Sequence, residues 1–406
     1  MLKKKAFKVA TLLLTFLFVV GLVAGCGSGS GEEGQGAAEE GKTYKIAFLG
    51  PLTGPNAGQG VGARNAFLLA VDQANESGEL PFKLEVMELD DESKPATSAS
   101  VAQKAVADPD VIAGSGHWNT PCAEASIPIF KSAGIPFVIW GAIGPSLTSP
   151  ENYPNTTRVC PTQAQENIPL AEFVIGELGR LKWAIISDTS SYGKSNTEAW
   201  QNEVKKYPGA EIVSLDEIQV GQTDFRPILS KIKNLDVDGV YFGGVVMEAA
   251  LVRRQMVELG MKDTLMVGIS GIVDDKFIET AGGDVAEGVI AIKPGMNIQK
   301  MEGGKAFEEA YAAAGFSEPY GAYGPYAYDA ANIIIEALKQ VGPDKAKLVD
   351  AIANISYEGL LGTTTFDEVG QTANIASTIF VIQDEQFVDW DDSEYKSGQR
   401  KLPGSK

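Results

Sequence analysis

Short apolar segments alternate with segments of helical periodicity along most of this chain. Residues 44–50 (YKIAFLG) have the apolar density of a buried strand. From Ala63 to Ala74, apolar side chains recur at i, i+3, i+4 and i+7, which is the spacing of an amphipathic helix. Further strands and helices follow in turn up to residue 139. Because a strand, a helix and a second strand in succession are typical of a parallel sheet, we predict an α/β fold.

A second series of strands and helices begins after a turn-rich interval at residues 144–154. Its predicted elements run from a helix at 163–178 to a helix at 274–280. Three more helices and two strands, at 363–366 and 377–382, complete the chain. About 365 residues follow position 41, a length that suits two domains of average size better than one. We therefore expect two Rossmann-like, doubly wound lobes.

The N-terminal residues have the pattern of an export signal. Four lysines precede an apolar run at 9–23, and the small residues Ala24 and Gly25 lead to Cys26. The apolar run is shorter than the ~20 residues that a membrane-spanning helix needs. Residues 22–26 (LVAGC) also look like a bacterial lipobox, in which case residues 1–25 are removed and Cys26 carries the lipid. The alternative is an ordinary secretory signal in which Cys26 has no role.

A flexible tether is predicted at residues 26–43. It is rich in Gly, Ser, Glu and Ala, and no large apolar side chain occurs between residues 27 and 41, so it cannot bury enough surface to fold by itself. The expected location is therefore the outer face of the cytoplasmic membrane, with the protein attached through a lipid. The formal net charge of −19 becomes −23 without residues 1–25, which disfavours nucleic acid and anionic lipid headgroups as partners.

Residue inventory argues against an enzyme, a metal site and a cofactor. The chain has one histidine, His117, in an apolar stretch, and a structural role for it is favoured over catalysis. Residues 58–63 (GQGVGA) imitate a dinucleotide fingerprint, but several residues separate them from the preceding strand, so no cofactor is expected. Cys122 and Cys160 either form a disulfide or are buried free thiols, and both interpretations are open.

Four loops at predicted strand ends combine small polar residues with aromatic ones. They are residues 52–59, 115–120, 139–143 and 188–192. In doubly wound folds, ligands lie outside the carboxyl ends of the strands. Together these loops predict a pocket for a small solute with a polar head and an apolar body.

With these loops, the chain resembles the leucine/isoleucine/valine-binding proteins, which are type I periplasmic binding proteins of ABC importers. The likeness covers residues 44–392. It rests on five segments: 46–55 (IAFLGPLTGP), 116–120 (GHWNT), 135–148 (IPFVIWGAIGPSLT), 188–193 (DTSSYG) and 362–370 (GTTTFDEVG). The resemblance implies two lobes joined by a three-stranded hinge, a Venus-flytrap arrangement that closes around a solute. It also implies a monomer that hands its solute to ABC permease subunits in the membrane.

The resemblance implies specific lobe boundaries. Residues 44–160 and 293–373 form lobe 1, and residues 161–292 and 374–406 form lobe 2. The chain is expected to cross between the lobes near 159–162, 291–294 and 372–376.

The resemblance also implies a ligand site, carried over residue by residue. Tyr192, an aromatic residue of lobe 2, and Tyr323, an aromatic residue near the pocket rim, are expected to face the solute. Residues of the strand-end loops of both lobes are expected to contact it as well. The predicted ligand-binding residues are Gln59, Trp118, Asn119, Thr120, Gly141, Ala142, Ile143, Tyr192, Ser270 and Tyr323.

Three of these positions depart from the family pattern. The amino-acid binders place an acid in lobe 2 to hold the ligand's ammonium, and Ser270 aligns there; Ile143 replaces a threonine and Gln59 a tyrosine. A buried ammonium without a carboxylate partner is costly. Either another acid (Glu248, Asp188 or Asp274) supplies the charge, or the ligand has no ammonium.

Two sets of function therefore stay open. The first is a solute-binding protein for a branched-chain or other amino acid. The alternatives are a binder of a small amide or of a short-chain or aromatic carboxylic acid, and a sensory ectodomain of the same fold.

Overall fold

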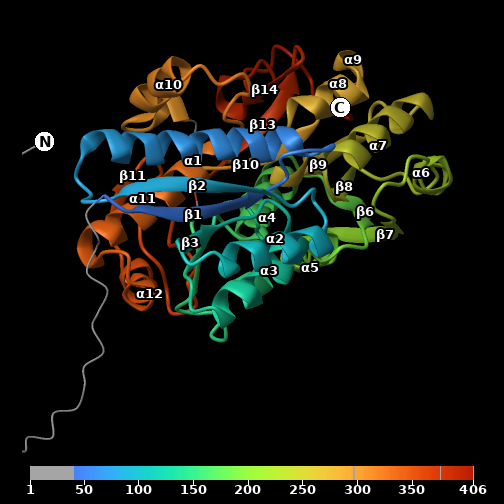
Figure 1. Ribbon diagram of the computed structural model, residues 1–406. Coiled ribbons are helices and arrows are strands. Elements are labelled where there is room, and N and C mark those ends of the chain that lie inside the picture. Colours follow the sequence, from blue (N-terminus) through green and yellow to red (C-terminus); the bar gives the residue numbers. More distant parts are fainter. Residues whose placement is uncertain (1–40, 296–297, 375, 406) are drawn as a thin grey trace, which may run out of the picture. The chain divides into compact units, whose positions relative to one another are not determined.

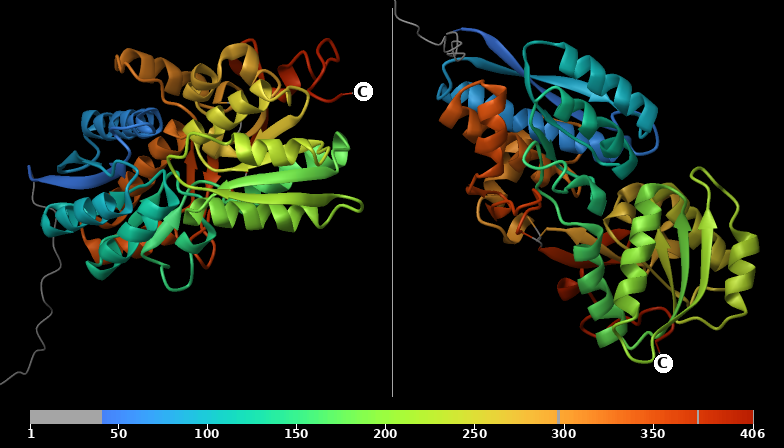
Figure 2. Two further views of the ribbon diagram at one scale, coloured as in Figure 1. Left: turned by 90° about the vertical axis from the view of Figure 1, so that its right-hand side faces the viewer. Right: turned by 90° about the horizontal axis from the view of Figure 1, so that it is seen from below.

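The computed structural model describes residues 41–295, 298–374 and 376–405. The predicted signal peptide, Cys26 and most of the predicted tether lie outside them. The described residues belong to one compact unit that contains two large sheets, each with its own helices (Figures 1 and 2).

The first sheet consists of five parallel strands in the order β2-β1-β3-β4-β5. Helices α1, α2 and α3 connect the first strands, and α10, α11 and α12 join this sheet later in the chain. The strands are β1 (Thr43–Gly50), β2 (Lys83–Asp90), β3 (Val111–Ser115), β4 (Phe137–Ile139) and β5 (Thr156–Arg158). The helices are α1 (Ala57–Ser77), α2 (Pro95–Ala107), α3 (Thr120–Ser132), α10 (Gly304–Ala313), α11 (Gly324–Val341) and α12 (Lys345–Ala353).

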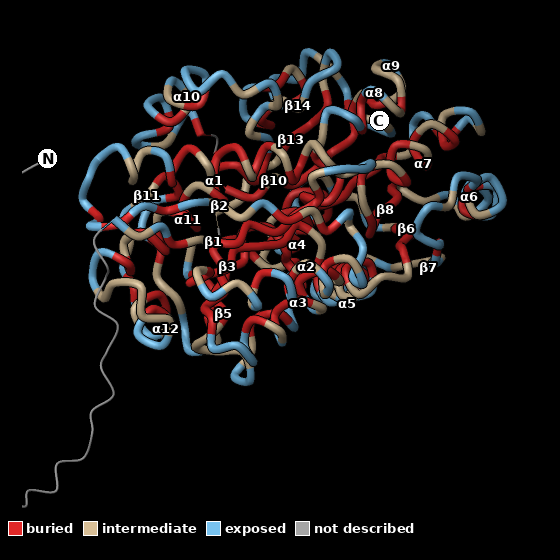
Figure 3. Tube along the Cα trace, viewed as in Figure 1, coloured by how far each residue is buried: buried red, intermediate tan, exposed pale blue. Residues whose placement is uncertain are grey.

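Strand β1 shows why this sheet has helices on both faces. Side chains alternate across a strand, so neighbouring residues face opposite sides. Ile46 and Phe48 belong to the hydrophobic cluster that includes residues of α1 and α11. Ala47 and Leu49 belong to the cluster formed with α2 and α3. An apolar run without alternation is therefore a strand buried on both faces. Figure 3 shows most of β1 as buried.

The second sheet has seven strands in the order β14-β13-β10-β9-β8-β6-β7. Five of them are parallel, β13 runs antiparallel to β10, and β14 runs antiparallel to β13. The strands are β6 (Lys182–Asp188), β7 (Glu211–Ile218), β8 (Gly239–Gly243), β9 (Leu265–Gly268), β10 (Ile290–Pro294), β13 (Ser377–Gln383) and β14 (Gln386–Asp389).

Six α-helices of the described residues accompany the second sheet. They are α4 (Gln163–Ala171), α5 (Ser191–Val204), α6 (Arg226–Lys233), α7 (Val246–Glu258), α8 (Asp275–Ala281) and α9 (Gly283–Ala286). A π-helical segment, η2 (Glu172–Glu177), continues α4, so the single helix predicted at 163–178 is two helical segments in sequence. Shorter elements complete the fold: the hairpin β11 (Tyr357–Gly359) and β12 (Gly362–Thr364), and the turns η1 (Pro145–Leu147), η3 (Ser270–Ile272), η4 (Ile298–Lys300) and η5 (Trp390–Asp392).

The chain passes between the two sheets three times: after β5, after β10 and before β13. These crossings are hydrogen-bonded to one another. The amide of Arg158 donates to the carbonyl of Gly370 (2.8 Å), and the amide of Gly295 donates to the carbonyl of Ala376 (2.8 Å). The predicted α/β fold with two lobes is confirmed. The lobe boundaries stay a prediction, and since β10 extends to Pro294, we propose that the second crossing begins after that residue.

Candidate functional site

A cavity of about 400 Å³ lies where the carboxyl ends of both sets of parallel strands meet. The residues around it follow β1, β2, β3 and β4 of the first sheet and β6, β7, β8 and β9 of the second, and Tyr323 precedes α11. The cavity thus lies where the strand-end rule expects a ligand, and both sheets contribute to it. Its lining consists of Asn56, Ser93, Pro95, Trp118, Asn119, Pro121, Gly141, Ile143, Asp188, Ser190, Ser191, Tyr192, Val220, Val245, Gly271 and Tyr323.

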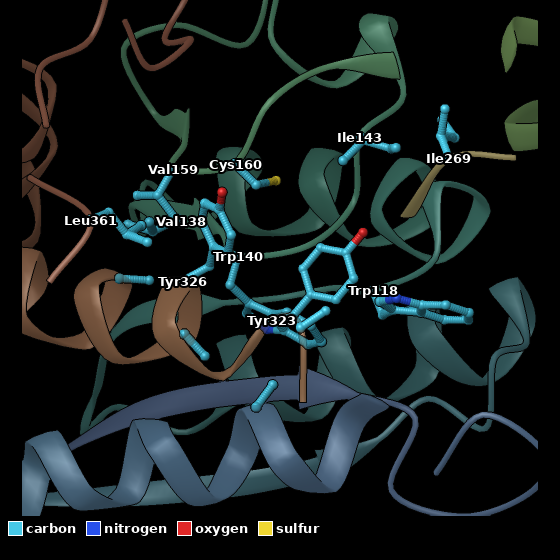
Figure 4. Packing of buried hydrophobic residues seen from close by; sticks show 14 of the residues in the cluster. Trp118, Val138, Trp140, Ile143, Val159, Cys160, Ile269, Tyr323, Tyr326 and Leu361 are labelled. Carbon is cyan, nitrogen blue, oxygen red and sulfur yellow. The ribbon is translucent and has the colours of Figure 1, made fainter. Parts of the chain in front are cut away.

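Aromatic side chains form much of the cavity wall. Trp118, Tyr192 and Tyr323 have only 6%, 9% and 2% of their surface exposed, so their positions are set by packing. The ring of Tyr323 makes an edge contact with Trp140, at 6.2 Å between centroids. Figure 4 shows Trp118, Ile143 and Tyr323 brought together from three separate segments. Flat, rigid walls of this kind suit an apolar ligand body.

Polar groups at the cavity come largely from the starts of two helices. Asn119 is the N-cap residue of α3, and Ser190 caps α5 by accepting a hydrogen bond from the amide of Gly193 (3.1 Å). Helix N-termini present unpaired amides and attract negative groups such as a carboxylate. The amide oxygen of Asn119 and the hydroxyl of Tyr192 have no hydrogen-bond partner among the described residues.

The charged lining of the cavity is a single acid. Asp188 ends β6, and burial raises the pKa of its carboxyl group, while hydrogen bonds from Ser190 lower it. Among the described residues, no lysine, arginine or histidine lines the cavity. An anionic ligand group would therefore be held by helix amides and neutral polar groups rather than by a salt bridge.

Six of the ten residues predicted to bind ligand line this cavity: Trp118, Asn119, Gly141, Ile143, Tyr192 and Tyr323. The other four lie nearby with different contacts. Thr120 accepts a hydrogen bond from the amide of Gly144 (3.1 Å), and the carbonyl of Ala142 accepts one from Arg158 (3.3 Å). Gln59 contacts residues 273 and 274, and Ser270 contacts Glu166. Ligand contact stays a prediction for all ten.

Several residues of the cavity wall were not predicted from the sequence. Val220, Val245 and Gly271 follow β7, β8 and β9, and applying the strand-end rule to every strand of the second series would have found them. Asn56 lies in the loop 52–59, which the strand-end rule selects, but Asn56 itself was not predicted to bind the ligand. Pro121 occupies the first turn of α3, where proline is common.

Glu166 is a second acid that no sequence motif indicated. It lies in the first turns of α4, which begins with a capping box made by Thr162 and Gln165. Glu166 is fully buried, and its Oε2 atom accepts hydrogen bonds from the hydroxyl (2.7 Å) and the amide (3.2 Å) of Ser270. Burial raises the pKa of this carboxyl group to about 8, although the Ser270 hydrogen bonds act in the opposite direction. Its position is set by tertiary packing, because 104 residues separate it from Ser270.

The three acids weighed as ammonium partners have different surroundings. Glu248 accepts a hydrogen bond from the amide of Gly221 (2.7 Å), outside the cavity lining. Asp274 caps α8 and accepts a hydrogen bond from Gln59 (2.8 Å). Only Asp188 lines the cavity, and its Oδ1 atom is bonded to Ser190.

His117 takes part in a closed hydrogen-bond network. Its Nδ1 atom lies 2.7 Å from the carboxylate of Asp91, and its Nε2 atom lies 3.4 Å from the hydroxyl of Ser98. This order of groups is that of a hydrolytic triad, but all three side chains are fully buried and none lines the cavity. The Ser98 hydroxyl also donates to the carbonyl of Cys122 (2.8 Å). The geometry supports the structural role predicted for His117.

The two described cysteines are free. Cys122 and Cys160 are both buried, which answers the open question in favour of free thiols. Burial raises the pKa of the Cys160 thiol to about 12 and also raises that of Cys122. Neither thiol is therefore a nucleophile in the folded protein.

Sequence comparison identifies relatives along nearly the whole chain. A family model described as "Periplasmic binding protein" matches residues 43–386. The leucine-, isoleucine-, valine-, threonine- and alanine-binding protein of Pseudomonas aeruginosa is 29% identical over 343 residues, which cover 83% of this chain and 89% of that protein. The Leu/Ile/Val-binding protein of Escherichia coli is 27% identical over 337 residues, with 83% and 90% covered.

Solved structures share the fold. A branched-chain amino acid transporter substrate-binding protein from Streptococcus pneumoniae, in complex with isoleucine, superimposes with a TM-score of 0.78 at 24% identity, covering 85% of this chain and 98% of that one. An ABC-transporter solute-binding protein from R. palustris, in complex with 4-hydroxybenzoate, gives a TM-score of 0.76 at 20% identity, with 86% and 95% covered. Both likenesses concern the fold, and the family match confirms the resemblance drawn from the strand-end loops. The chain belongs to the periplasmic binding protein family.

Proposed function

We propose that this protein captures a branched-chain or other amino acid in the cavity between its two lobes and delivers it, as a monomer, to the permease subunits of an ABC importer. The main support is the cavity itself. The residues that line it lie at the ends of eight parallel strands, four in each sheet. The names of the relatives support the same class of ligand.

The mechanism follows from a lining that belongs to both lobes. A solute in the cavity contacts Trp118 and Ile143 from lobe 1 and Tyr192 and Val245 from lobe 2. Such a ligand binds the closed arrangement better than an open one, and this difference in affinity shifts the population toward closure. Closure then gives the permease a surface that distinguishes the loaded protein from the empty one.

A second ligand class has its own support. Three aromatic walls and a lining without basic side chains also fit an amide or an aromatic carboxylic acid, and one structural neighbour holds 4-hydroxybenzoate. A sensory ectodomain would use the same cavity. Loss of uptake in a cell that lacks the protein, with signalling unchanged, favours the importer over the sensor.

A thermal-shift screen tests the binding function directly. The screen includes leucine, isoleucine, valine, small amides and aromatic acids. A ligand at 100 times its dissociation constant adds ~2.7 kcal/mol to the free energy of unfolding, which raises the melting temperature measurably. We expect a shift with at least one branched-chain amino acid and no chemical change of the solute. If no small solute shifts the transition, the proposed function is wrong.

We also propose that Cys26 is lipidated and that residues 26–43 attach the binding unit to the outer face of the cytoplasmic membrane. The support is the lipobox-like segment 22–26. No helix of the described ranges is long and apolar enough to span a membrane. Replacing Cys26 with Ala should move the protein from the membrane fraction to the soluble extracytoplasmic fraction. Retention of the variant in the membrane fraction would contradict the anchor.

A further inference from the structure

One buried carboxylate oxygen in the described part of the chain has no hydrogen-bond partner. It is Oε1 of Glu166, and every other atom in this condition belongs to an amide, a hydroxyl, an indole or a guanidinium group. The side chain is fully buried, and its second oxygen is bonded to Ser270. Half of this carboxyl group therefore lacks the compensation that buried polar groups normally have.

Other buried acids of the described residues do not share this property. Asp91 lies 2.7 Å from His117, and Asp329 accepts backbone hydrogen bonds from Leu360 (3.0 Å) and Leu361 (2.7 Å), one on each oxygen. Glu166 has no salt bridge within the described ranges. A buried carboxylate without a counter-charge is costly, so this site is prepared for a positive charge that the chain does not supply.

The groups around Glu166 connect it to the ligand cavity. Ser270 is followed directly by Gly271, which lines the cavity, and Tyr192 and Tyr323 line it as well. Burial raises the pKa of both tyrosines, and the charge of Glu166 raises it further. When Glu166 is ionised, its charge acts on two cavity walls and therefore also on a solute between them.

The titratable groups facing Glu166 are neutral. They come from the segment after β5, from α5, from β8 and from the start of α11. They are Cys160, Tyr192, Tyr241, Tyr323 and Tyr326.

We propose that Glu166, from its position behind Ser270, makes the cavity select solutes that carry an ammonium group. This inference rests on the proposed function and specifies its ligand. Ser270 stands where the family's acid was expected, and the acid lies one hydrogen bond behind it. The unpartnered amide oxygen of Asn119 and hydroxyl of Tyr192 are further acceptors in the lining.

The proposal has a proton balance that can be measured. With a pKa of about 8, Glu166 is mainly protonated at neutral pH in the ligand-free protein. An incoming ammonium stabilises the carboxylate, so the O–H bond of Glu166 breaks and its proton passes to the buffer. The ligand keeps its own proton, and the charge of its ammonium is balanced by that of Glu166 behind Ser270.

Calorimetry in two buffers measures this proton release. The wild-type protein is titrated with L-leucine at about pH 7, once in phosphate and once in Tris, whose ionisation enthalpies differ. We expect close to one proton released per leucine bound. The matched ligand is 4-methylpentanoate, which is leucine without its ammonium, and it should bind more weakly and release no proton. If 4-methylpentanoate binds as tightly as leucine, or leucine binds without proton release, the inference is overturned.

The variant Glu166→Gln removes the charge and keeps the shape. Leucine should bind at least about tenfold more weakly to it and release no proton, while 4-methylpentanoate should bind as it does to the wild type. Asp329→Asn is the matched control, because it also neutralises a fully buried acid, but the hydrogen-bond partners of Asp329, Leu360 and Leu361, are not next to the cavity lining. Equal losses of leucine affinity in both variants would contradict the proposal.

The thermal-shift screen distinguishes a failure of ammonium selection from a failure of solute binding. If only solutes without an ammonium bind, the selection by Glu166 is wrong and solute binding stands. If no solute binds, both are wrong.

Discussion

The side-chain nitrogen of Gln59 lies 2.8 Å from Oδ2 of Asp274 and 3.0 Å from the carbonyl of Val273. Gln59 belongs to α1 of the first lobe, whereas Asp274 caps α8 of the second. A second bond between the lobes joins the hydroxyl of Ser191 to Glu124 (2.7 Å). Ligand contact by Gln59 stays a prediction, and in the structure its side-chain amide connects the two lobes outside the cavity wall.

Replacing Gln59 with Ala should weaken ligand binding about 5- to 150-fold, because the closed arrangement loses two hydrogen bonds worth about 0.5–1.5 kcal/mol each and the open one loses none. The dissociation constant from calorimetry measures the effect. Gln73→Ala is the matched control, since Gln73 lies on the same helix and accepts a hydrogen bond from Tyr328 within lobe 1. An equal change in both variants would show that the bond to Asp274 has no role in closure.

Replacing Trp118 with Ala should lower ligand affinity at least about tenfold, because a rigid aromatic wall of the cavity is lost. Trp390→Ala provides the comparison. Trp390 is similarly buried and packs against Phe173 at 4.7 Å between ring centroids, away from the cavity. We expect Trp390→Ala to lower the melting temperature and to leave the dissociation constant unchanged. If Trp390→Ala weakens binding and Trp118→Ala leaves the dissociation constant unchanged, the ligand binds elsewhere.

The stability of the ligand-free protein should fall as pH rises from about 4.5 to about 8, in part because of Glu166. Its pKa is raised from the ordinary value of 4.5 to about 8, so over this range the native state holds a proton that the unfolded chain has lost. The free energy of unfolding decreases with pH wherever the native state binds more protons. Asp329, with its pKa raised by burial to about 7, acts in the same direction.

Urea denaturation between about pH 5 and about pH 8 measures this slope. The slope should become shallower in Glu166→Gln and shallower again when Asp329→Asn is added. A slope that is unchanged in Glu166→Gln would mean that Glu166 is ionised in the native state.

Cys122 and Cys160 should resist alkylation in the native protein. Both are buried, and a thiol whose pKa is far above neutral is rarely the reactive thiolate. Iodoacetamide followed by peptide mass spectrometry should label both residues after denaturation without a reductant, and neither of them before. A disulfide-linked peptide that contains both cysteines would contradict the free thiols.

The sequence predicted the strands best where the apolar pattern lies within one short segment. The predicted strand at 44–50 is β1, and the late strands predicted at 363–366 and 377–382 correspond to β12 and β13. Short or edge elements were missed. β5 has three residues and β14 four, and neither is long enough to show a period.

The candidate site was only partly predictable, for the same reason. Residues immediately after strands, such as Trp118 and Tyr192, were found because the strand-end rule needs only the order of elements along the chain. The difference between Tyr192 in the cavity wall and Gln59 between the lobes depends on how helices pack, which no local pattern encodes.

By itself, the sequence determined the α/β class, the two series of strands and the family, because apolar periodicity and loop motifs are properties of short segments. Only the tertiary structure decided that Glu166 lies behind Ser270 and that Gln59 reaches Asp274, pairs that are 104 and 215 residues apart. Desolvation of a carboxyl group is a property of everything packed around it. That an acid, Glu166, lies next to position 270 in space is therefore revealed only by the folded chain.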